Sequence, residues 1–302
     1  MPCAPRYLSR AAEIQLTATN TDLTAPHAPA QAVLDKLDRL RALLRGYGAA
    51  VVAYSGGVDS SFLAAVAHQT LGAKAVIVTA KSPSVAPEEL DAAVALARAC
   101  GWDHRVIETR EMADPRYVAN DTRRCYFCKD ELYTRLNELA RAEGITVIAN
   151  GANVDDLGDY RPGMDAAKQY GVCSPLIEAG LIKAEIRGLS RELGLPTWDK
   201  PAQPCLSSRI PYGTQVSLDA LEKIGKAEAA LRRVGFREVR VRHHGDVARI
   251  EVPAPEIARF ADATVREAVL KGIRAAGYRW ATLDLAGFKS GSLNEGVTGK
   301  KE

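Results

Sequence analysis

A glycine-rich turn between an apolar run and a helical pattern is the feature that most constrains this chain. The heptapeptide Ser55-Gly56-Gly57-Val58-Asp59-Ser60-Ser61 directly follows the apolar run 49–54 and opens the helical stretch 60–71. Paired glycines let the backbone approach an anion closely, and the free N–H groups of a helix N-terminus favour negative charge. The segment therefore predicts a phosphate-binding loop. It is not a Walker loop, because no lysine follows the glycines.

Apolar runs and helical patterns alternate on both sides of this loop. Strand-like runs lie at 49–54, 75–79, 105–108 and 145–149, and helical patterns lie at 60–71, 87–100 and 129–143. Such alternation predicts an α/β fold with a doubly wound parallel sheet, whose ligands bind beyond the carboxyl ends of the strands. The glycine turn and the segments 81–83 and 150–156 all fall at that edge.

The pattern changes after residue 200, where several prolines crowd one segment. A helix at 218–234, a hairpin of strands at 239–243 and 247–252, a helix at 264–276 and a strand at 278–284 then predict a smaller α+β domain. The predicted organisation is a leader at 1–31, the phosphate-loop domain at 32–200, the α+β domain at 201–295 and a tail at 296–302.

Composition narrows the class of protein. The chain has 47% hydrophobic and 25% charged residues and a net charge of +3, which is too small to indicate a nucleic-acid partner without a clustered basic run. No apolar stretch reaches the length of a bilayer span and the N-terminus lacks a secretion signal, so we predict a cytoplasmic protein without a membrane partner. Six cysteines in 302 residues do not form a disulfide scaffold.

Two arginines in the predicted hairpin are candidates for binding an anion. Arg240 and Arg242 are two residues apart, so they lie on the same side of one strand and can form a phosphate clamp. A solvated charged face is the alternative. The loop 205–214 adds hydroxyl and guanidinium donors, including Ser208 and Arg209, of the kind that a phosphoester requires.

Several motifs in order carry a specific resemblance. The glycine-rich loop resembles the PP-loop of ATP pyrophosphatases. It is followed by Asn150-Gly151-Ala152-Asn153, by Asp159-Tyr160-Arg161-Pro162-Gly163, by Ser207-Ser208-Arg209-Ile210-Pro211-Tyr212-Gly213 and by Val239-Arg240-Val241-Arg242. Together these motifs resemble the LarE family, the ATP-dependent sulfur transferases of nickel-pincer nucleotide biosynthesis.

The resemblance implies a reaction and a set of roles. ATP with Mg²⁺ would activate the carboxylates of pyridinium-3,5-biscarboxylic acid mononucleotide as acyl adenylates, with release of AMP and pyrophosphate, and sulfur would then give thiocarboxylates. We expect a homo-oligomer, and the sequence does not give its number of subunits. The resemblance implies that the binding partner is this small mononucleotide and not a nucleic acid. The ATP site would comprise Ser55, Gly56, Gly57, Val58, Asp59, Ser60, Ser61, Asp156 and Arg161, with Asp59 also catalytic. Ser208, Arg209, Arg240 and Arg242 would bind the substrate phosphate, Glu228 would lie near the sulfur-transfer centre, and Glu251 is a candidate magnesium ligand.

The cysteines leave the sulfur source open. Cys125 and Cys128 form a C-x-x-C pair, and Cys205 directly precedes the S-S-R motif. Three cysteines fit a 4Fe-4S cluster with one iron that lacks a protein ligand. A zinc site is the competitor, but no histidine has an obvious spacing for a fourth ligand. Some relatives sacrifice the sulfur of one cysteine, and Cys205 is the candidate for that role. The sequence does not indicate which sulfur donor would restore the sulfide of such a cluster.

Three other functions are alternatives to this prediction. A PP-loop tRNA thiolase shares adenylation but would need an RNA-binding surface, and no basic stripe is visible. A nucleotide-sensing module without turnover would show a decayed phosphate loop, and this loop is intact. An amidating synthetase would use ammonia, whereas the cysteine arrangement favours sulfur. We therefore expect an ATP-dependent sulfurtransferase.

Overall fold

The computed structural model describes residues 29–158 and 162–289. Most of the predicted leader, the predicted tail and Arg161 therefore lie outside the described residues. No helix within the described ranges is both long enough and apolar enough to cross a membrane.

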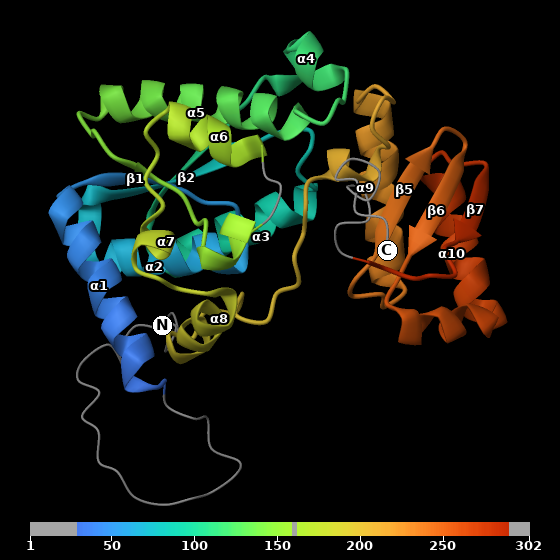
Figure 1. The fold of residues 1–302 in the computed structure, drawn as a ribbon. Helices are drawn as coiled ribbons and strands as arrows, with labels where there is room; N and C mark the ends of the chain where they lie inside the picture. Colours follow the sequence, from blue (N-terminus) through green and yellow to red (C-terminus); the bar gives the residue numbers. More distant parts are fainter. Residues whose placement is uncertain (1–28, 159–161, 290–302) are drawn as a thin grey trace, which may run out of the picture.

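The first part of the chain forms a parallel sheet between two layers of helices (Figure 1). Its strands are β1 (Ala50–Ala53), β2 (Ala75–Lys81), β3 (Asp103–Glu108) and β4 (Ile148–Ala149), in the order β3-β2-β1-β4, and every pair is parallel. One face is covered by α1 (Gln31–Tyr47), α2 (Val58–Leu71), α3 (Pro87–Ala99) and α8 (Lys183–Glu192), and the other by α5 (Arg124–Ala142) and α6 (Pro162–Gln169). The predicted doubly wound α/β fold is confirmed.

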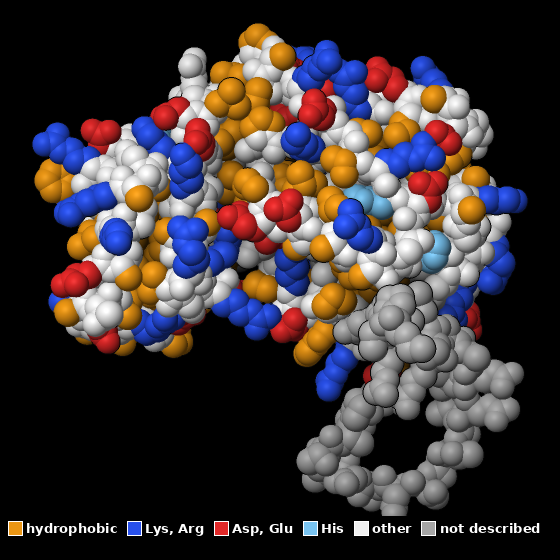
Figure 2. Space-filling model, turned by 180° about the vertical axis from the view of Figure 1, so that it is seen from behind, with side chains coloured by type: hydrophobic (Ala, Val, Ile, Leu, Met, Phe, Trp, Pro, Cys, Tyr) orange, Lys and Arg blue, Asp and Glu red, His pale blue; other side chains and the backbone are white. Residues whose placement is uncertain are grey.

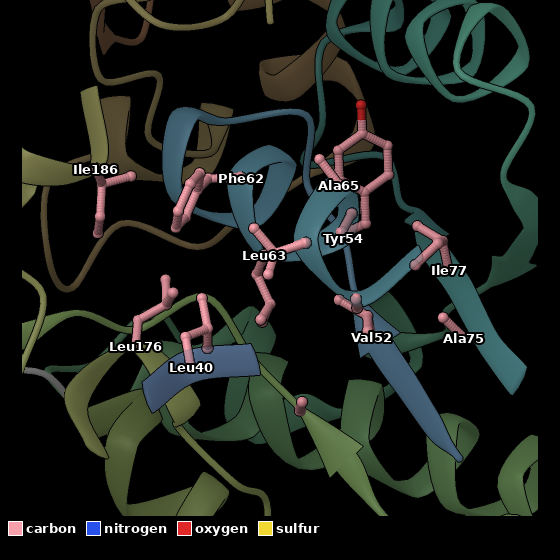
Figure 3. Close-up of a cluster of buried hydrophobic side chains, with 14 of the residues drawn as sticks. Leu40, Val52, Tyr54, Phe62, Leu63, Ala65, Ala75, Ile77, Leu176 and Ile186 are labelled. Atoms are coloured by element: carbon pink, nitrogen blue, oxygen red, sulfur yellow. The ribbon is translucent and has the colours of Figure 1, made fainter. Parts of the chain in front are cut away.

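Alternation along β1 explains why both faces are covered. Val52 belongs to a buried cluster that also contains residues of α1, α2 and α8, of which Figure 3 labels Leu40, Phe62 and Ile186. Val51, the preceding residue, packs with residues of α5 and α6 on the opposite face. Both valines are fully buried, as expected for a central strand of a parallel sheet. This packing fixes the end of β1, from which the phosphate loop leaves.

The second part of the chain builds a smaller sheet with two helices. It contains α9 (Leu218–Arg233), β5 (Arg240–His244), β6 (Val247–Glu251), α10 (Ala263–Ala275) and β7 (Trp280–Leu283). The predicted hairpin is confirmed, because β5 and β6 pair antiparallel around a turn in which Gly245 has a φ of 61°. β7 pairs parallel with β6, which gives the order β5-β6-β7.

Short helices join these elements and shape the site. They are α4 (Pro115–Val118), α7 (Pro175–Glu178) and the 3-10 turns η1 (Gly72–Lys74), η2 (Glu111–Ala113), η3 (Val154–Gly158), η4 (Leu206–Arg209) and η5 (Ala254–Ala261). A buried apolar cluster joins α4 and α5 to η4 and α9 through Tyr117, Phe127, Leu206 and Ile224. The predicted domain boundary at residue 200 stays a prediction, and this cluster packs residues from both sides of it.

Two predicted boundaries differ from the structure. The helix predicted at 129–143 begins at Arg124, so the C-x-x-C pair lies within its first two turns rather than before it. The strand predicted at 145–149 pairs only over Ile148–Ala149. On its other edge β4 forms an isolated parallel bridge between Ala149 and Cys173, where the N–H of Asn150 donates to the carbonyl oxygen of Cys173 (2.9 Å).

Candidate active site

The glycine-rich loop connects β1 to the N-terminus of α2, where Gly57 is the N-cap. Gly56 has a φ of 73°, and a Cβ added to it would lie 2.9 Å from the Cβ of Ala93. Only glycine therefore suits this position. The Ser60 hydroxyl oxygen accepts from the N–H of Ser55 (3.1 Å) and lies 3.0 Å from the Ser55 hydroxyl. The loop is closed on itself with the first turn of α2 beneath it, which is the arrangement that an anion cradle requires.

Two lysines from distant parts of the chain reach this loop. The Lys183 ammonium, in the first turn of α8, pairs with the Asp59 carboxylate. The Lys200 ammonium donates to the carbonyl oxygen of Gly56 (3.0 Å) and pairs with Glu89 (2.6 Å). Neither lysine is recognisable from the sequence, because they lie 124 and 144 residues from their loop partners. The missing lysine of the loop was the available signal that a cation had to come from elsewhere.

The loop after β4 packs directly against the phosphate loop. A Cβ added to Gly151 would lie 2.9 Å from the backbone nitrogen of Ser60, so the two loops approach at backbone distance. The Asp156 carboxylate accepts from the N–H of Asn153 (3.0 Å), and the Asp155 carboxylate accepts from the N–H of Lys183 (2.7 Å). Asp156 thus lies beside the predicted ATP site and braces its own loop.

The three predicted cysteine ligands lie close together. Cys125 and Cys128 lie in the first two turns of α5, and Cys205 immediately precedes η4. All three are free thiols. Burial raises the pKa of Cys125, and the charge of Cys205 raises it further. Burial also raises the pKa of Cys128 to about 12, with a smaller contribution from Cys205. The thiols therefore lie within electrostatic range of one another.

The fit of these thiols to a metal group is partial. Their chemistry suits iron or zinc, because thiolates are the ligands that both prefer. In the part of the chain that the structure describes, however, no group of three or more His, Cys, Asp or Glu side chains is arranged to hold a metal ion. The structure thus brings the three residues into one region but does not form a coordination shell.

The loop that carries Cys205 is held by buried hydrogen bonds. The N–H of Leu206 donates to the carbonyl oxygen of Ser84 (2.8 Å), just beyond the carboxyl end of β2. The hydroxyl oxygens of Ser207 and Tyr117 lie 2.6 Å apart, and Arg124 donates to the Ser207 carbonyl oxygen (2.9 Å). These contacts fix Cys205 between the first sheet and the C-x-x-C turn.

Arginines gather on the other side of this loop. Arg242 makes two bonds to Glu251 (2.9 and 2.8 Å) and donates to the Ser208 carbonyl oxygen (2.8 Å). Arg209 makes two bonds to Glu228 (2.7 and 3.1 Å). Both arginines are buried, and both guanidinium groups make paired hydrogen bonds to a carboxylate. The predicted clamp is therefore not formed by two equivalent open guanidinium groups.

Arg240 differs from its neighbours. Its side chain is buried, and it makes no hydrogen bond or ion pair with a described residue. Its guanidinium lies 4.2 Å from the centre of the Phe288 ring. Burial, followed by the positive charges of Arg209 and Arg242, lowers the pKa of Arg240 to about 10. A buried cation with no carboxylate partner is suited to bind an anion from outside the chain.

Glu228 and Glu251 organise these arginines. Glu228 is fully buried, pairs with Arg209 and Arg232, and accepts from the N–H of Val241 (3.1 Å). Glu251 pairs with Arg242 and Arg249. Their predicted roles near the sulfur centre and toward magnesium stay predictions. In the structure each carboxylate is occupied by two guanidinium groups.

Known proteins are similar to this chain over most of its length. A family model for asparagine synthase matches residues 41–155, the segment that holds the phosphate loop. An uncharacterized protein of Synechocystis is 48% identical over 263 residues, which cover 87% of this chain and 98% of that protein. The pyridinium-3,5-bisthiocarboxylic acid mononucleotide synthase of Lactiplantibacillus plantarum, a LarE protein, is 37% identical over 260 residues, covering 86% of this chain and 94% of its own. The chain belongs to the LarE family.

A more distant relative is an uncharacterized protein of Methanocaldococcus jannaschii. It is 25% identical over 240 residues, which cover 80% of this chain and 90% of that protein. The matches to all three relatives extend well past the asparagine synthase segment. Each of these matches covers at least 80% of this chain, whereas the asparagine synthase model covers only residues 41–155.

The Glu228 network gives a testable expectation for stability. Glu228→Gln removes the charge that compensates Arg209, so we expect the free energy of unfolding to fall by about 3–5 kcal/mol. Glu222→Gln is the matched control on α9, because its carboxylate is exposed and pairs only with Lys226. That change is expected to cost less than about 1 kcal/mol. Urea unfolding of both variants measures the difference, and equal costs would contradict the buried-network interpretation.

Proposed function

We propose that this LarE-family protein uses ATP to transfer sulfur to the carboxylates of pyridinium-3,5-biscarboxylic acid mononucleotide. Similarity to the Lactiplantibacillus plantarum synthase supports the substrate class. The observation that carries the proposal is Arg240, a buried guanidinium without a carboxylate partner among the described residues, beside the Cys205 loop. The phosphate of a mononucleotide supplies the charge that Arg240 lacks.

The reaction proposed at the phosphate loop is adenylation of the substrate carboxylate, and the positive charges at the loop favour it. A substrate carboxylate oxygen attacks the α-phosphate, the bond to the β-phosphate breaks, and pyrophosphate leaves with the electron pair. The acyl adenylate that results is activated toward a sulfur nucleophile. The N-terminus of α2 and the lysines at the loop neutralise the leaving pyrophosphate.

A magnesium ion fits this site. One oxygen of the Asp59 carboxylate is buried and has no hydrogen-bond partner among the described residues. A buried carboxylate oxygen without a partner is costly, and a hard cation bound together with ATP phosphates would satisfy it. Asp59 would hold the ion, and Mg²⁺ would supply charge neutralisation to the phosphates.

For the sulfur source we propose that Cys125, Cys128 and Cys205 hold a 4Fe-4S cluster with one open iron site. Proximity of the three thiols supports this ligand set. A cluster of this kind would supply a sulfide that is not part of the chain. The alternative is that Cys205 donates its own sulfur, and it would then need neither Cys125 nor Cys128. We further propose that the protein acts as a homo-oligomer in the cytoplasm.

The first prediction concerns the products of ATP. With the mononucleotide present, we expect AMP and pyrophosphate in equal amounts, because attack at the α-phosphate releases both. Asp59→Asn is expected to lower the rate of AMP formation by at least about 100-fold, since it removes the proposed magnesium ligand. Asp91→Asn, an exposed aspartate on α3, is the matched control and should leave the rate unchanged. ADP and orthophosphate as first products would contradict the proposal.

The second prediction concerns the phosphate of the substrate. Arg240→Ala removes a charge-assisted contact, so we expect about 1.5–3 kcal/mol weaker binding of the mononucleotide and little change for its dephosphorylated nucleoside. Because the pKa of Arg240 is about 10, mononucleotide affinity should hold at neutral pH and fall as the pH rises through that value. Titration calorimetry measures both ligands, with the exposed Arg233→Ala as control. Equal weakening of both ligands by Arg240→Ala would exclude the phosphate assignment.

The third prediction separates the two sulfur sources. A cluster predicts about four iron atoms per chain after anaerobic reconstitution, and an unchanged protein mass after turnover. A sacrificial Cys205 predicts activity without iron and a loss of one sulfur from the chain. Cys125→Ala/Cys128→Ala should abolish activity only in the first case, with Cys173→Ala as control. Full activity of the iron-free protein would rule out the cluster.

A further inference from the structure

The connector between α8 and η4 passes the phosphate loop before it reaches Cys205. Figure 1 shows this segment running from α8 toward the second sheet. Along it, the Lys200 ammonium donates to the Gly56 carbonyl oxygen (3.0 Å) and pairs with Glu89 on α3 (2.6 Å). The side chain of Lys200 is 20% exposed, so solvent and solutes reach it. An ammonium has three donors, and these contacts use two of them.

The main chain at Lys200 is held from two directions. Arg187 of α8 donates to the carbonyl oxygens of Trp198 (2.7 Å) and Lys200 (2.8 Å). Arg237, which lies between α9 and β5, pairs with Asp199 (2.7 Å). The backbone of this connector is therefore fixed to both parts of the molecule, and the ammonium is held at the phosphate loop.

Cys205 follows five residues later on the same connector. Pro201 and Pro204 restrict the backbone between them, and the Arg209 guanidinium donates to the Pro204 carbonyl oxygen (2.8 Å). Five residues span at most roughly 17 Å even when fully extended. A displacement of Lys200 therefore has a short and restricted path to the loop that carries the cysteine.

We propose that Lys200 binds the β,γ-pyrophosphate portion of ATP and couples its presence to the position of Cys205. This inference rests on the proposed function. A polyphosphate carries more negative charge than the Gly56 carbonyl and the Glu89 carboxylate offer, so it competes for the ammonium. When the bond between the α- and β-phosphates breaks, the leaving pyrophosphate keeps the electron pair, and Lys200 neutralises that charge without giving up a proton. Release of pyrophosphate returns the ammonium to Gly56 and Glu89.

A purely structural role for Lys200 makes different predictions. Its pair with Glu89 is partly exposed, and pairs of this kind contribute little to stability. If holding α3 to the connector were its only task, removing either partner would have the same small effect. If it binds the polyphosphate, loss of the lysine affects ATP use much more than loss of the glutamate.

The first test therefore compares Lys200→Met with Glu89→Gln in steady-state AMP formation by the full-length protein. Lys200→Met is expected to lower kcat/KM for ATP about 10- to 100-fold, the loss that one charge-assisted contact corresponds to. Glu89→Gln is expected to stay within about threefold of wild type. Lys200→Arg keeps the charge and should recover most of the loss. An unaffected Lys200→Met protein, or equal losses in the methionine, arginine and Glu89→Gln variants, would overturn the proposal.

The second test measures whether binding of an ATP analogue changes the reactivity of Cys205. In iron-free protein, a non-cleavable α,β-methylene analogue of ATP should change the rate of Cys205 alkylation by iodoacetamide at least about threefold, as followed by peptide mass spectrometry. In Lys200→Met the saturating analogue should leave that rate unchanged. An equal response in both proteins would overturn the coupling, and so would no response in wild type. If Lys200→Met fails to fold, as judged by circular dichroism, Lys200→Gln takes its place with the same expectations.

These outcomes remain distinct from failure of the proposed function. If wild type with ATP and the mononucleotide forms no AMP, the adenylation proposal itself fails. If wild type forms AMP and the Lys200 variants match it, adenylation stands and only the role of Lys200 is excluded.

Discussion

The arginine cluster of the second sheet has more buried positive than negative charge, and the arrangement of the site depends on this imbalance. Arg209, Arg240 and Arg242 are buried together, whereas Glu228 and Glu251 are the carboxylates that contact them. Burying an ion pair costs desolvation that is recovered only when geometry is good and every donor is used. Arg209 and Arg242 meet that condition through paired bonds. Arg240 does not, because it contacts the Phe288 ring instead, so an added anion would supply the hydrogen bonds that no described carboxylate gives it.

The Cys205 loop connects this charge to the rest of the molecule. Its backbone accepts from Arg242 at Ser208 and from Arg124 at Ser207, and its Leu206 N–H donates to Ser84 at the end of β2. A single short segment is thus bonded to the second sheet, to the helix that carries the C-x-x-C pair and to the edge of the first sheet. Cys205 therefore lies where the second sheet, the C-x-x-C helix and the edge of the first sheet come together.

Sequence patterns predicted the local parts of this arrangement well. The phosphate loop was predicted from its neighbours alone, because paired glycines between an apolar run and a helical pattern are typical of an anion-binding turn. The shared strand side of Arg240 and Arg242 followed from the period of a β-strand. What the pattern could not reveal was which of the two was already paired. That depends on Glu251, which lies opposite Arg240 in the β-ladder yet bonds to Arg242.

Contacts between distant residues account for the remaining misses. Lys183 and Lys200 follow no local rule at the phosphate loop, since tertiary packing of α8 and its connector brings them there. The start of α5 at Arg124 was missed for a related reason. The first turn has an irregular apolar pattern, and its Arg124 is held by the Ser207 carbonyl oxygen and Asn120 rather than by a capping side chain. Sequence alone therefore predicted the loop and the motifs, but not the cations that complete them.

The burial of Arg240 also bears on the size of the substrate. Proteins that bind polynucleotides present exposed lysines and arginines along a surface, so that many backbone phosphates are contacted at once. Figure 2 shows basic and acidic side chains intermixed on the face it presents, without a continuous basic field. Arg240 is only 7% exposed and lies against the Phe288 ring, so it is not part of an exposed row of cations. The charge distribution therefore favours a mononucleotide over a transfer RNA.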